Sequence, residues 1–278
     1  MFRIAGRWEL YMTVQPTEVP VHAAFSVAGR SIVITGATGA LGSEAATALA
    51  SLGANLTLAG GNNDALVKLT DGLSPLGHAV AVPLRPQTPQ DAASIVEAAG
   101  AAYGRIDGLL VASGTNKVAP IGDMPVEDFD AVMDANVRGS WLMCQAVGRQ
   151  LLAQDSGGSV VLVSSTRGKL GHPAGYSAYC PSKAAVDLLA KSLATEWGGH
   201  GIRVNALAPT VFRSELTSWM YADDEKGTAT REAMLARIPL KRLAEPEDFV
   251  GALVYLLSNA SSFLTGQVLY LDGGYTSC

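Results

Sequence analysis

Charged residues are scarce in this sequence of 278 residues, and those present lean acidic. Only 16% of the residues are charged and 48% are apolar, whereas a typical globular domain is about 25% charged. Disordered chains and coiled coils are rich in charged residues and poorer in apolar ones, so this composition argues against both classes. The 20 lysines and arginines are outnumbered by 25 aspartates and glutamates. No local run of basic residues offsets that excess, so no nucleic-acid partner is predicted.

Cysteines and long apolar runs are also few. Cys144, Cys180 and Cys278 are too few and too oddly numbered for a disulfide framework, which indicates a reducing compartment. No apolar run approaches the roughly 20 residues that cross a bilayer. The first two dozen residues contain no continuous apolar stretch of the kind found in a signal peptide. The sequence therefore predicts a soluble, cytoplasmic protein with no membrane partner.

From about residue 25 onward, short apolar strands alternate with helices. Strands that are apolar throughout are typical of a parallel sheet covered on both faces, and the connections are too long for hairpins. The prediction is an α/β fold, a Rossmann-type doubly wound parallel sheet of about seven strands in one domain, residues 25–278. Residues 1–24 show no period and are predicted to be a loosely ordered appendage. The expected strands are 31–35, 55–59, 79–84, 108–112, 159–164, 203–208 and 267–271, and the expected helices are 43–52, 66–73, 92–103, 127–136, 140–153 and 179–197.

A glycine-rich turn, TGATGALG at residues 35–42, follows the first expected strand. Gly36, Gly39 and Gly42 let the backbone turn sharply and approach a pyrophosphate, which the unpaired N–H groups of the next helix then face. A tight turn that needs positive φ is the alternative explanation. Because the glycines recur at every third residue in the first strand-to-helix turn, a nucleotide site is favoured.

Tyr179 and Lys183 are four residues apart at the start of a long expected helix, so they share one helical face. A free tyrosine has a pKa near 10, and a neighbouring ammonium lowers that pKa, so the pair could exchange a proton with an alcohol or a carbonyl. On spacing alone, an amphipathic helix with an incidental tyrosine is the simpler explanation. Ser164 and Ser165 end the fifth strand, at the sheet edge where ligands bind. Asn136 is a polar residue within a helical run, and it needs a partner or a role.

Together these motifs resemble the short-chain dehydrogenase/reductase family over nearly all of residues 25–275. The single-domain type is the better match, and members like gluconate 5-dehydrogenase look most similar. The matching features, in order, are the glycine turn, Asn136, Ser164-Ser165, Tyr179-x-x-x-Lys183, IRVN at 202–205 with Pro209, and LDGG at 271–274.

The resemblance implies an NAD(P)-dependent dehydrogenase or reductase with a catalytic set of Asn136, Ser165, Tyr179 and Lys183. Tyr179 would be the general acid/base, and Lys183 would lower its pKa and hold the nicotinamide ribose. Ser165 would orient the substrate oxygen, with Ser164 as the alternative, and Asn136 would hold a water in the proton relay. No metal is expected. The implied cofactor-binding residues are Gly36, Thr38, Gly39, Leu41, Gly42, Gly60, Gly61, Ala112, Gly114, Tyr179, Lys183, Pro209 and Val211.

Several departures from the family pattern lie on the cofactor side. Ala40 stands where single-domain members usually have glycine, and residues 111–114 (VASG) replace polar side chains that steady the central strand. Arg85 occupies the place of an aspartate that touches adenine, and Thr210 replaces a glycine. These changes predict weaker or unusually arranged cofactor binding with the chemistry retained.

The residues at the end of the second expected strand do not decide between NAD and NADP. Dinucleotide sites usually place an acid there for the ribose 2′-hydroxyl, or an arginine for a 2′-phosphate. The sequence at 60–63, GGNN, contains neither. Asn62 and Asn63 can hydrogen-bond either group, and Arg85 adds positive charge. We expect use of both cofactors with a small lean to NADP(H), about 1 kcal/mol or about fivefold.

The expected substrate is a small secondary alcohol or ketone, with a sugar acid or polyol favoured by resemblance at 114–116, 175–177 and 266–270. Residues 210–240 would form the substrate lid, or else a surface helix pair. Arg167, Lys169 and His172 could face a carboxylate, or be solvated. A 3-oxoacyl-carrier-protein reductase and a non-catalytic dinucleotide-binding regulatory protein remain alternatives. Helices 140–153 and 179–197 are apolar over more of their circumference than one sheet face can cover, and the family resemblance implies a homotetramer through these helices.

Overall fold

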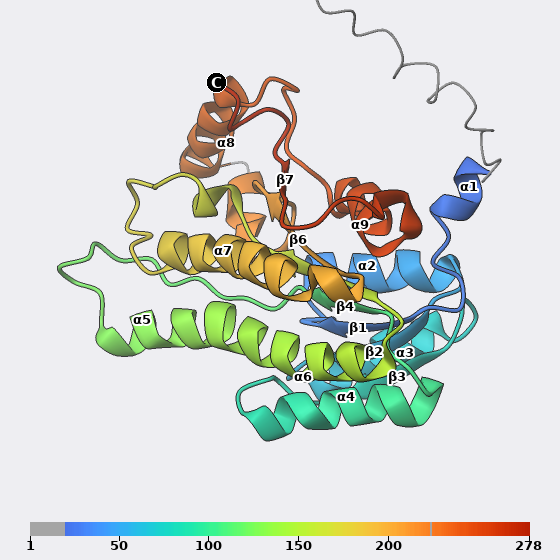
Figure 1. Ribbon diagram of the computed structural model, residues 1–278. Helices are drawn as coiled ribbons and strands as arrows, with labels where there is room; N and C mark the ends of the chain where they lie inside the picture. The colour runs from blue at the N-terminus through green and yellow to red at the C-terminus, as the bar shows by residue number, and fades with distance from the viewer. Residues whose placement is uncertain (1–19, 223) are drawn as a thin grey trace, which may run out of the picture.

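Seven parallel strands form one sheet at the centre of the chain in the computed structural model, which describes residues 20–222 and 224–278 (Figure 1). Their order is β3-β2-β1-β4-β5-β6-β7, and every neighbouring pair is parallel. The predicted class, a doubly wound Rossmann-type sheet, is confirmed. The strands are β1 (Ser31–Thr35), β2 (Asn55–Ala59), β3 (Ala79–Val82), β4 (Gly108–Val111), β5 (Gly158–Val163), β6 (Ile202–Pro209) and β7 (Val268–Leu271).

Most helices begin and end close to their predicted bounds, and the last long one matches them at both ends. The expected helices leave out α1 (Val21–Ala24), α8 (Glu225–Arg237) and α9 (Val250–Leu257), although α8 lies within the surface helix pair given as an alternative for residues 210–240. The polar residues of α8 carry no apolar period and α9 is apolar on all sides, so neither has an amphipathic pattern. The helices are α1 (Val21–Ala24), α2 (Ala40–Ser51), α3 (Asn63–Leu73), α4 (Pro89–Tyr103), α5 (Val126–Met133), α6 (Gly139–Gln154), α7 (Tyr179–Trp197), α8 (Glu225–Arg237) and α9 (Val250–Leu257).

Each face of the sheet packs on its own helices, and Figure 1 shows α4 and α6 on one side and α2 and α9 on the other. Ile95 of α4 and Val147 of α6 belong to one buried cluster. Leu49 of α2 and Leu253 of α9 belong to the other. Full burial of one such side chain stabilises the fold by about 1.5–3 kcal/mol. The central strands are apolar throughout because both of their faces are covered.

The direction of strand succession reverses beside β1, since the chain moves outward to β2 and β3 and then returns to β4 on the other side. In open α/β sheets this reversal creates a ligand-binding crevice at the carboxyl ends of the strands. Gly36 follows β1 with φ +68°, and a Cβ on it would lie 2.5 Å from the backbone nitrogen of Ser113. The loops after β1 and β4 therefore touch, and only glycine fits between them.

Most of the predicted appendage, residues 1–24, lies outside the described residues. Its last part contains the one-turn helix α1, and Phe25 packs near Tyr255, with ring centroids 6.2 Å apart. None of the helices in residues 20–222 and 224–278 has the length and apolar character that a bilayer-spanning helix needs.

Candidate active site

The glycine turn leads directly into the amino end of α2. Gly39 is the N-cap residue and supplies no side-chain hydrogen bond to the first turn, so backbone N–H groups there are available to an anion. A Cβ on Gly42 would lie 2.2 Å from the Gly36 carbonyl oxygen, so the helix packs tightly on the turn. Leu41 lies in this first turn. This close packing and the set of amide donors fit the pyrophosphate of a dinucleotide.

The remaining predicted cofactor residues lie along the same edge of the sheet. Thr38 is next to Gly60, where a Cβ would lie 3.6 Å from the threonine hydroxyl oxygen. Ala112 continues from β4, Pro209 ends β6 and Val211 follows it. These positions surround the carboxyl ends of β1, β2, β4 and β6, as a dinucleotide lying across the sheet requires.

Tyr179 begins α7, and its side chain faces the end of β5. The Ser165 side chain, which follows Ser164 at the end of that strand, lies close enough to the Tyr179 hydroxyl to lower its pKa. The Ser165 hydroxyl oxygen also accepts a hydrogen bond from the Arg167 backbone N–H at 3.1 Å. The Ser164 hydroxyl instead donates to the Lys183 carbonyl oxygen at 3.2 Å. Of the two serines, Ser165 is the one that reaches the tyrosine.

Lys183 lies one turn further along α7 and is almost fully buried. Its Nζ donates to the Val163 carbonyl oxygen at 2.8 Å and lies 5.7 Å from the centroid of the Tyr179 ring. Burial lowers the pKa of Lys183 to about 8, although the nearby Asp187 carboxylate opposes that shift. The ammonium is therefore held by the fold at a fixed place beside the tyrosine.

Burial is the main influence on the pKa of Tyr179. Burial raises the pKa of Tyr179 above its ordinary value, and the nearby Tyr176 and Cys180 add to that shift. The Ser165 side chain and the Arg167 charge oppose the shift but do not cancel it. The net pKa of Tyr179 is therefore raised, and a lowering effect of the Lys183 ammonium stays a prediction. The pKa is raised because the free-energy cost of removing the phenolate from water exceeds the stabilisation that Ser165 and Arg167 provide.

Asn136 lies in a wide π turn, Asp134–Arg138, between α5 and α6. The helix predicted to end near this residue continues into α6 through a π-helical turn. Such turns are frequent at functional sites. The Asn136 Oδ1 accepts from the Thr115 N–H at 2.8 Å. Its Nδ2 donates to the Thr115 carbonyl oxygen and to the Ser182 hydroxyl, both at 2.9 Å. Both amide hydrogens are therefore used by the protein itself.

Gly114 connects this network to Lys183. A Cβ on Gly114 would lie 3.1 Å from Asn136 Oδ1 and 3.4 Å from Lys183 Nζ. The segment after β4 therefore passes close to both predicted catalytic residues. Within the same segment, the Ser113 hydroxyl oxygen lies 3.2 Å from that of Thr35. Ser113 thus gives this segment one polar contact to β1, and the effect of the replaced side chains on cofactor binding stays a prediction.

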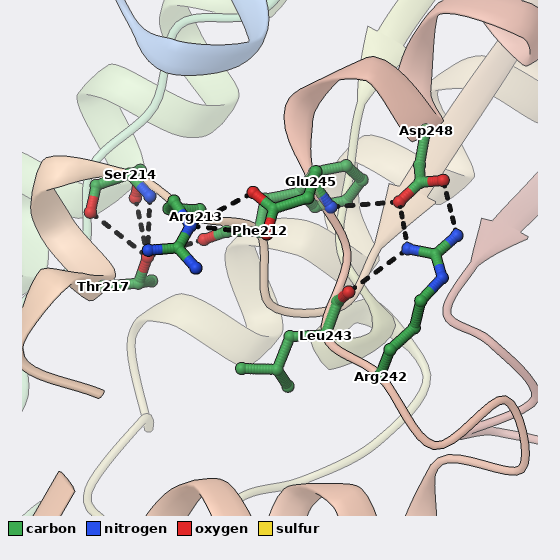
Figure 2. Close-up of polar contacts among 8 residues, drawn as sticks. All are labelled: Phe212, Arg213, Ser214, Thr217, Arg242, Leu243, Glu245 and Asp248. Carbon is green, nitrogen blue, oxygen red and sulfur yellow. Dashed lines mark hydrogen bonds and ion pairs between the residues drawn. The ribbon is translucent and has the colours of Figure 1, made fainter. Parts of the chain in front are cut away.

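The segment predicted to be a lid has its two ends tied together (Figure 2). Phe212 forms an isolated parallel bridge with Ala244, and Arg213 Nε lies 3.2 Å from a Glu245 carboxylate oxygen. The Arg213 guanidinium also lies 4.0 Å from the centroid of the Tyr221 ring. Close to the second end, Arg242 makes two hydrogen bonds to the Asp248 carboxylate, at 2.6 and 2.7 Å.

A second polar cluster lies beside Tyr179, and the sequence identified only part of it. His172 stacks on Tyr176, with centroids 4.3 Å apart, and Tyr176 meets the Tyr179 ring edge-on at 5.9 Å. Burial lowers the pKa of His172, and the Arg167 charge lowers it further. The same Arg167 charge opposes the raised pKa of Tyr179. Arg167 and His172 were predicted from their closeness to Ser165.

Arg237 and Tyr275 complete the cluster and were not predicted. The nearly fully buried Tyr275 accepts hydrogen bonds on its hydroxyl from Arg167 at 3.2 Å and from Arg237 at 2.9 Å. Neither residue belongs to a motif, and they come together only through tertiary packing. The described residues contain no group of three or more potential metal-ligating side chains.

A family model described as enoyl-(acyl carrier protein) reductase matches residues 36–276. The chain belongs to the short-chain dehydrogenase/reductase family. It is 70% identical to an uncharacterized oxidoreductase of Mycobacterium tuberculosis (strain H37Rv) over 92% of this chain and 94% of that protein. It is 36% identical to the gluconate 5-dehydrogenase of Gluconobacter oxydans, over 91% and 96% of the two chains.

A solved structure with the same fold is that of a gluconate 5-dehydrogenase from Burkholderia cenocepacia in complex with NADP and tartrate. Its TM-score is 0.84 at 28% identity, and the match covers 92% of this chain and 98% of that one. The predicted resemblance to the single-domain short-chain dehydrogenase/reductase family is thereby confirmed. This short-chain dehydrogenase/reductase is an oxidoreductase, and NAD(P) dependence is typical of its family.

Proposed function

We propose that this enzyme transfers hydride between NAD(P)(H) and a secondary alcohol or ketone of a sugar acid or polyol. The observation that carries the reaction type is the arrangement of Tyr179, Ser165 and Lys183 at the carboxyl edge of β5. The bound nicotinamide would supply or accept the hydride. The residues of the chain would handle the proton at the substrate oxygen.

In the reducing direction, the Tyr179 phenol donates its proton to the carbonyl oxygen as that oxygen becomes negative. The raised pKa keeps the phenol protonated at neutral pH, which suits donation. Ser165, whose side chain is near Tyr179, orients the same oxygen. The Lys183 ammonium stabilises negative charge on the phenolate that remains, from a position fixed by Val163. Oxidation of the alcohol runs through the same groups in reverse.

The two arginines on Tyr275 support an acidic substrate. Two positive charges converge on one neutral hydroxyl, and among the described residues no carboxylate lies within 4 Å of either guanidinium. An anion is the natural partner for such a pair. Because the Arg167 charge also reaches Tyr179, a substrate carboxylate near Arg167 would leave its hydroxyl-bearing carbons close to the reactive phenol.

A matched substrate panel tests this proposal. Turnover would be measured with NAD and NADP on aldonic acids and on polyols of equal chain length, and with NADH and NADPH on the corresponding 2-keto and 5-keto acids. We expect the acids to be turned over with at least tenfold higher kcat/KM than the polyols. Arg167→Gln should remove most of that difference while leaving polyol turnover within about twofold. Equal turnover of acids and polyols would reject the role of the arginines, and the polyol class would then stand.

Two other functions are separated by the same assay. A 3-oxoacyl-carrier-protein reductase shares the catalytic residues and would instead reduce 3-oxoacyl thioesters. A basic surface for the acidic carrier would support it, but the chain has a net charge of −5. A non-catalytic regulatory protein would bind the dinucleotide with no turnover of any substrate in the panel.

We also propose that the enzyme is a cytoplasmic homotetramer whose residues 210–240 form a substrate lid. The free thiols of all three cysteines support a reducing compartment. Trp141 of α6 and Leu188 of α7 are exposed, at 46% and 63%, which supports association through these helices. A light-scattering mass of one chain at micromolar concentration would reject the tetramer.

A further inference from the structure

The end of β2 is covered by a side chain from the segment after β3. A Cβ built on Gly61 would lie 2.2 Å from Nε of Arg85, 2.9 Å from its Cδ and 3.0 Å from its Cγ. No residue with a side chain fits at position 61 while Arg85 keeps this conformation. Gly61 shows no positive φ, so its lack of a side chain matters here for space rather than for backbone angle.

The Arg85 backbone is held in place on both sides. Arg85 precedes Pro86, which restricts its φ and ψ to extended values. The Arg85 carbonyl oxygen accepts from the Gln87 N–H at 2.8 Å. Pro86 is buried against Gly139 at the start of α6, where a Cβ would lie 3.4 Å from the proline carbonyl oxygen. The arginine therefore extends over Gly61 from a fixed base.

The guanidinium itself has free donors. Arg85 is exposed, and no side-chain hydrogen bond or ion pair to it occurs within residues 20–222 and 224–278. Other groups at this edge are less available. Asn62 is the N-cap of α3, and its Oδ1 accepts from the Ala65 N–H at 3.1 Å. Asp64 lies in the first turn of α3, beyond the strand end.

We propose that Arg85 is the residue that reads the ribose 2′ position, and that it binds the 2′-phosphate of NADP in the space left by Gly61. In a dinucleotide fold the adenosine ribose lies at the end of the second strand, where an acid would select the hydroxyl and an arginine the phosphate. Here the guanidinium comes from the segment that follows the neighbouring strand β3. It would offer two parallel N–H donors to a dianionic phosphate, a contact that the 2′-hydroxyl of NAD cannot match.

This assignment rests on the proposed dinucleotide site and changes the expected selectivity. A charged hydrogen bond lost from such a site costs roughly tenfold to a hundredfold in affinity. The enzyme should therefore bind NADP at least tenfold more tightly than NAD, more than the fivefold lean expected from the sequence. The difference should shrink as salt is raised, since the contact is at an exposed site.

Two nucleotide fragments test the contact without any turnover. Isothermal titration calorimetry would measure dissociation constants of 2′,5′-ADP and 5′-AMP for the wild-type enzyme, Arg85→Ala and Gly61→Ala. Arg85→Ala should weaken 2′,5′-ADP binding at least tenfold and leave 5′-AMP within twofold. Gly61→Ala should also weaken 2′,5′-ADP binding at least tenfold, because its methyl group displaces the arginine, and its apparent melting temperature should match wild type. Lys68→Ala, an exposed lysine of α3, removes the same charge elsewhere and should change neither constant.

The outcomes separate this assignment from the site on which it rests. Equal effects of Arg85→Ala on the two fragments, or no effect on 2′,5′-ADP, would overturn the role of Arg85 while leaving the dinucleotide site intact. Failure of the wild-type enzyme to bind either fragment, or NADH and NADPH, would overturn the dinucleotide site itself.

Discussion

Removal of the Asn136 side chain should affect stability and turnover together. Asn136→Ala deletes three hydrogen bonds, two to the backbone of Thr115 and one to the Ser182 hydroxyl. Each contributes about 1 kcal/mol net, so the free energy of unfolding should fall by about 3 kcal/mol. For a chain of this size that corresponds to a loss of roughly 6–12 °C in apparent melting temperature.

Turnover should fall as well, because Asn136 holds two segments of the site. The Ser182 hydroxyl accepts a hydrogen bond from Asn136 Nδ2, and it donates one to the Tyr179 carbonyl oxygen at 2.7 Å. Thr115 follows Gly114, which passes close to Lys183 Nζ. A small displacement of both elements should lower kcat by roughly tenfold or more.

Asn205→Ala is the matched control. Asn205 is fully buried in β6 and makes two hydrogen bonds at 3.0 Å, to the Leu264 carbonyl oxygen and from the Gln267 N–H. Its loss should reduce the melting temperature by a similar amount and leave kcat within about threefold. Differential scanning fluorimetry and steady-state kinetics provide the two measurements. An Asn136→Ala enzyme with wild-type melting temperature and turnover would refute the reasoning, and so would equal loss of turnover in both variants.

Two further predictions concern the charged groups of the site. Burial lowers the pKa of Lys183 to about 8 from its ordinary 10.5, so the folded chain loses this proton first. Burying the charged Lys183 ammonium lowers the free energy of unfolding. This loss is complete below pH 8 and fades as pH rises toward 10.5. Wild type should thus gain melting temperature relative to Lys183→Met between pH 7 and 9.5, and a constant difference would contradict this. Glu245→Gln weakens the exposed tie to Arg213, so it should raise KM severalfold with less than about 1 kcal/mol of stability lost. An unchanged KM would show that this tie does not hold the lid.

The sheet and its longest helix were predictable because their signals are local. β1, β2 and α7 are continuous runs whose composition and period match the structure at both ends. The candidate catalytic residues were also predictable, since each stands in a motif at a strand or helix end. The Tyr179-x-x-x-Lys183 spacing is common by chance, and it became informative because the other motifs occur in the expected order along the chain.

Features that depend on burial or on long side chains were not predictable. The raised pKa of Tyr179 results from desolvation, which no sequence spacing reveals. The direction of Arg85 depends on a glycine 24 positions earlier, and Arg237 meets Tyr275 only because α8 packs against the last residues of the chain. α8 itself lacks the apolar period that marks a helix.

Tyr179→Phe tests the central claim most directly, because it removes one hydroxyl and leaves the ring in place. Turnover with the best substrate of the panel would be measured beside the dissociation constant of NADPH, from the quenching of protein fluorescence. The account predicts that kcat falls by a factor on the order of a hundred or more, with NADPH affinity and melting temperature close to wild type. A Tyr179→Phe enzyme that keeps its turnover would contradict the assignment of Tyr179 as the acid/base.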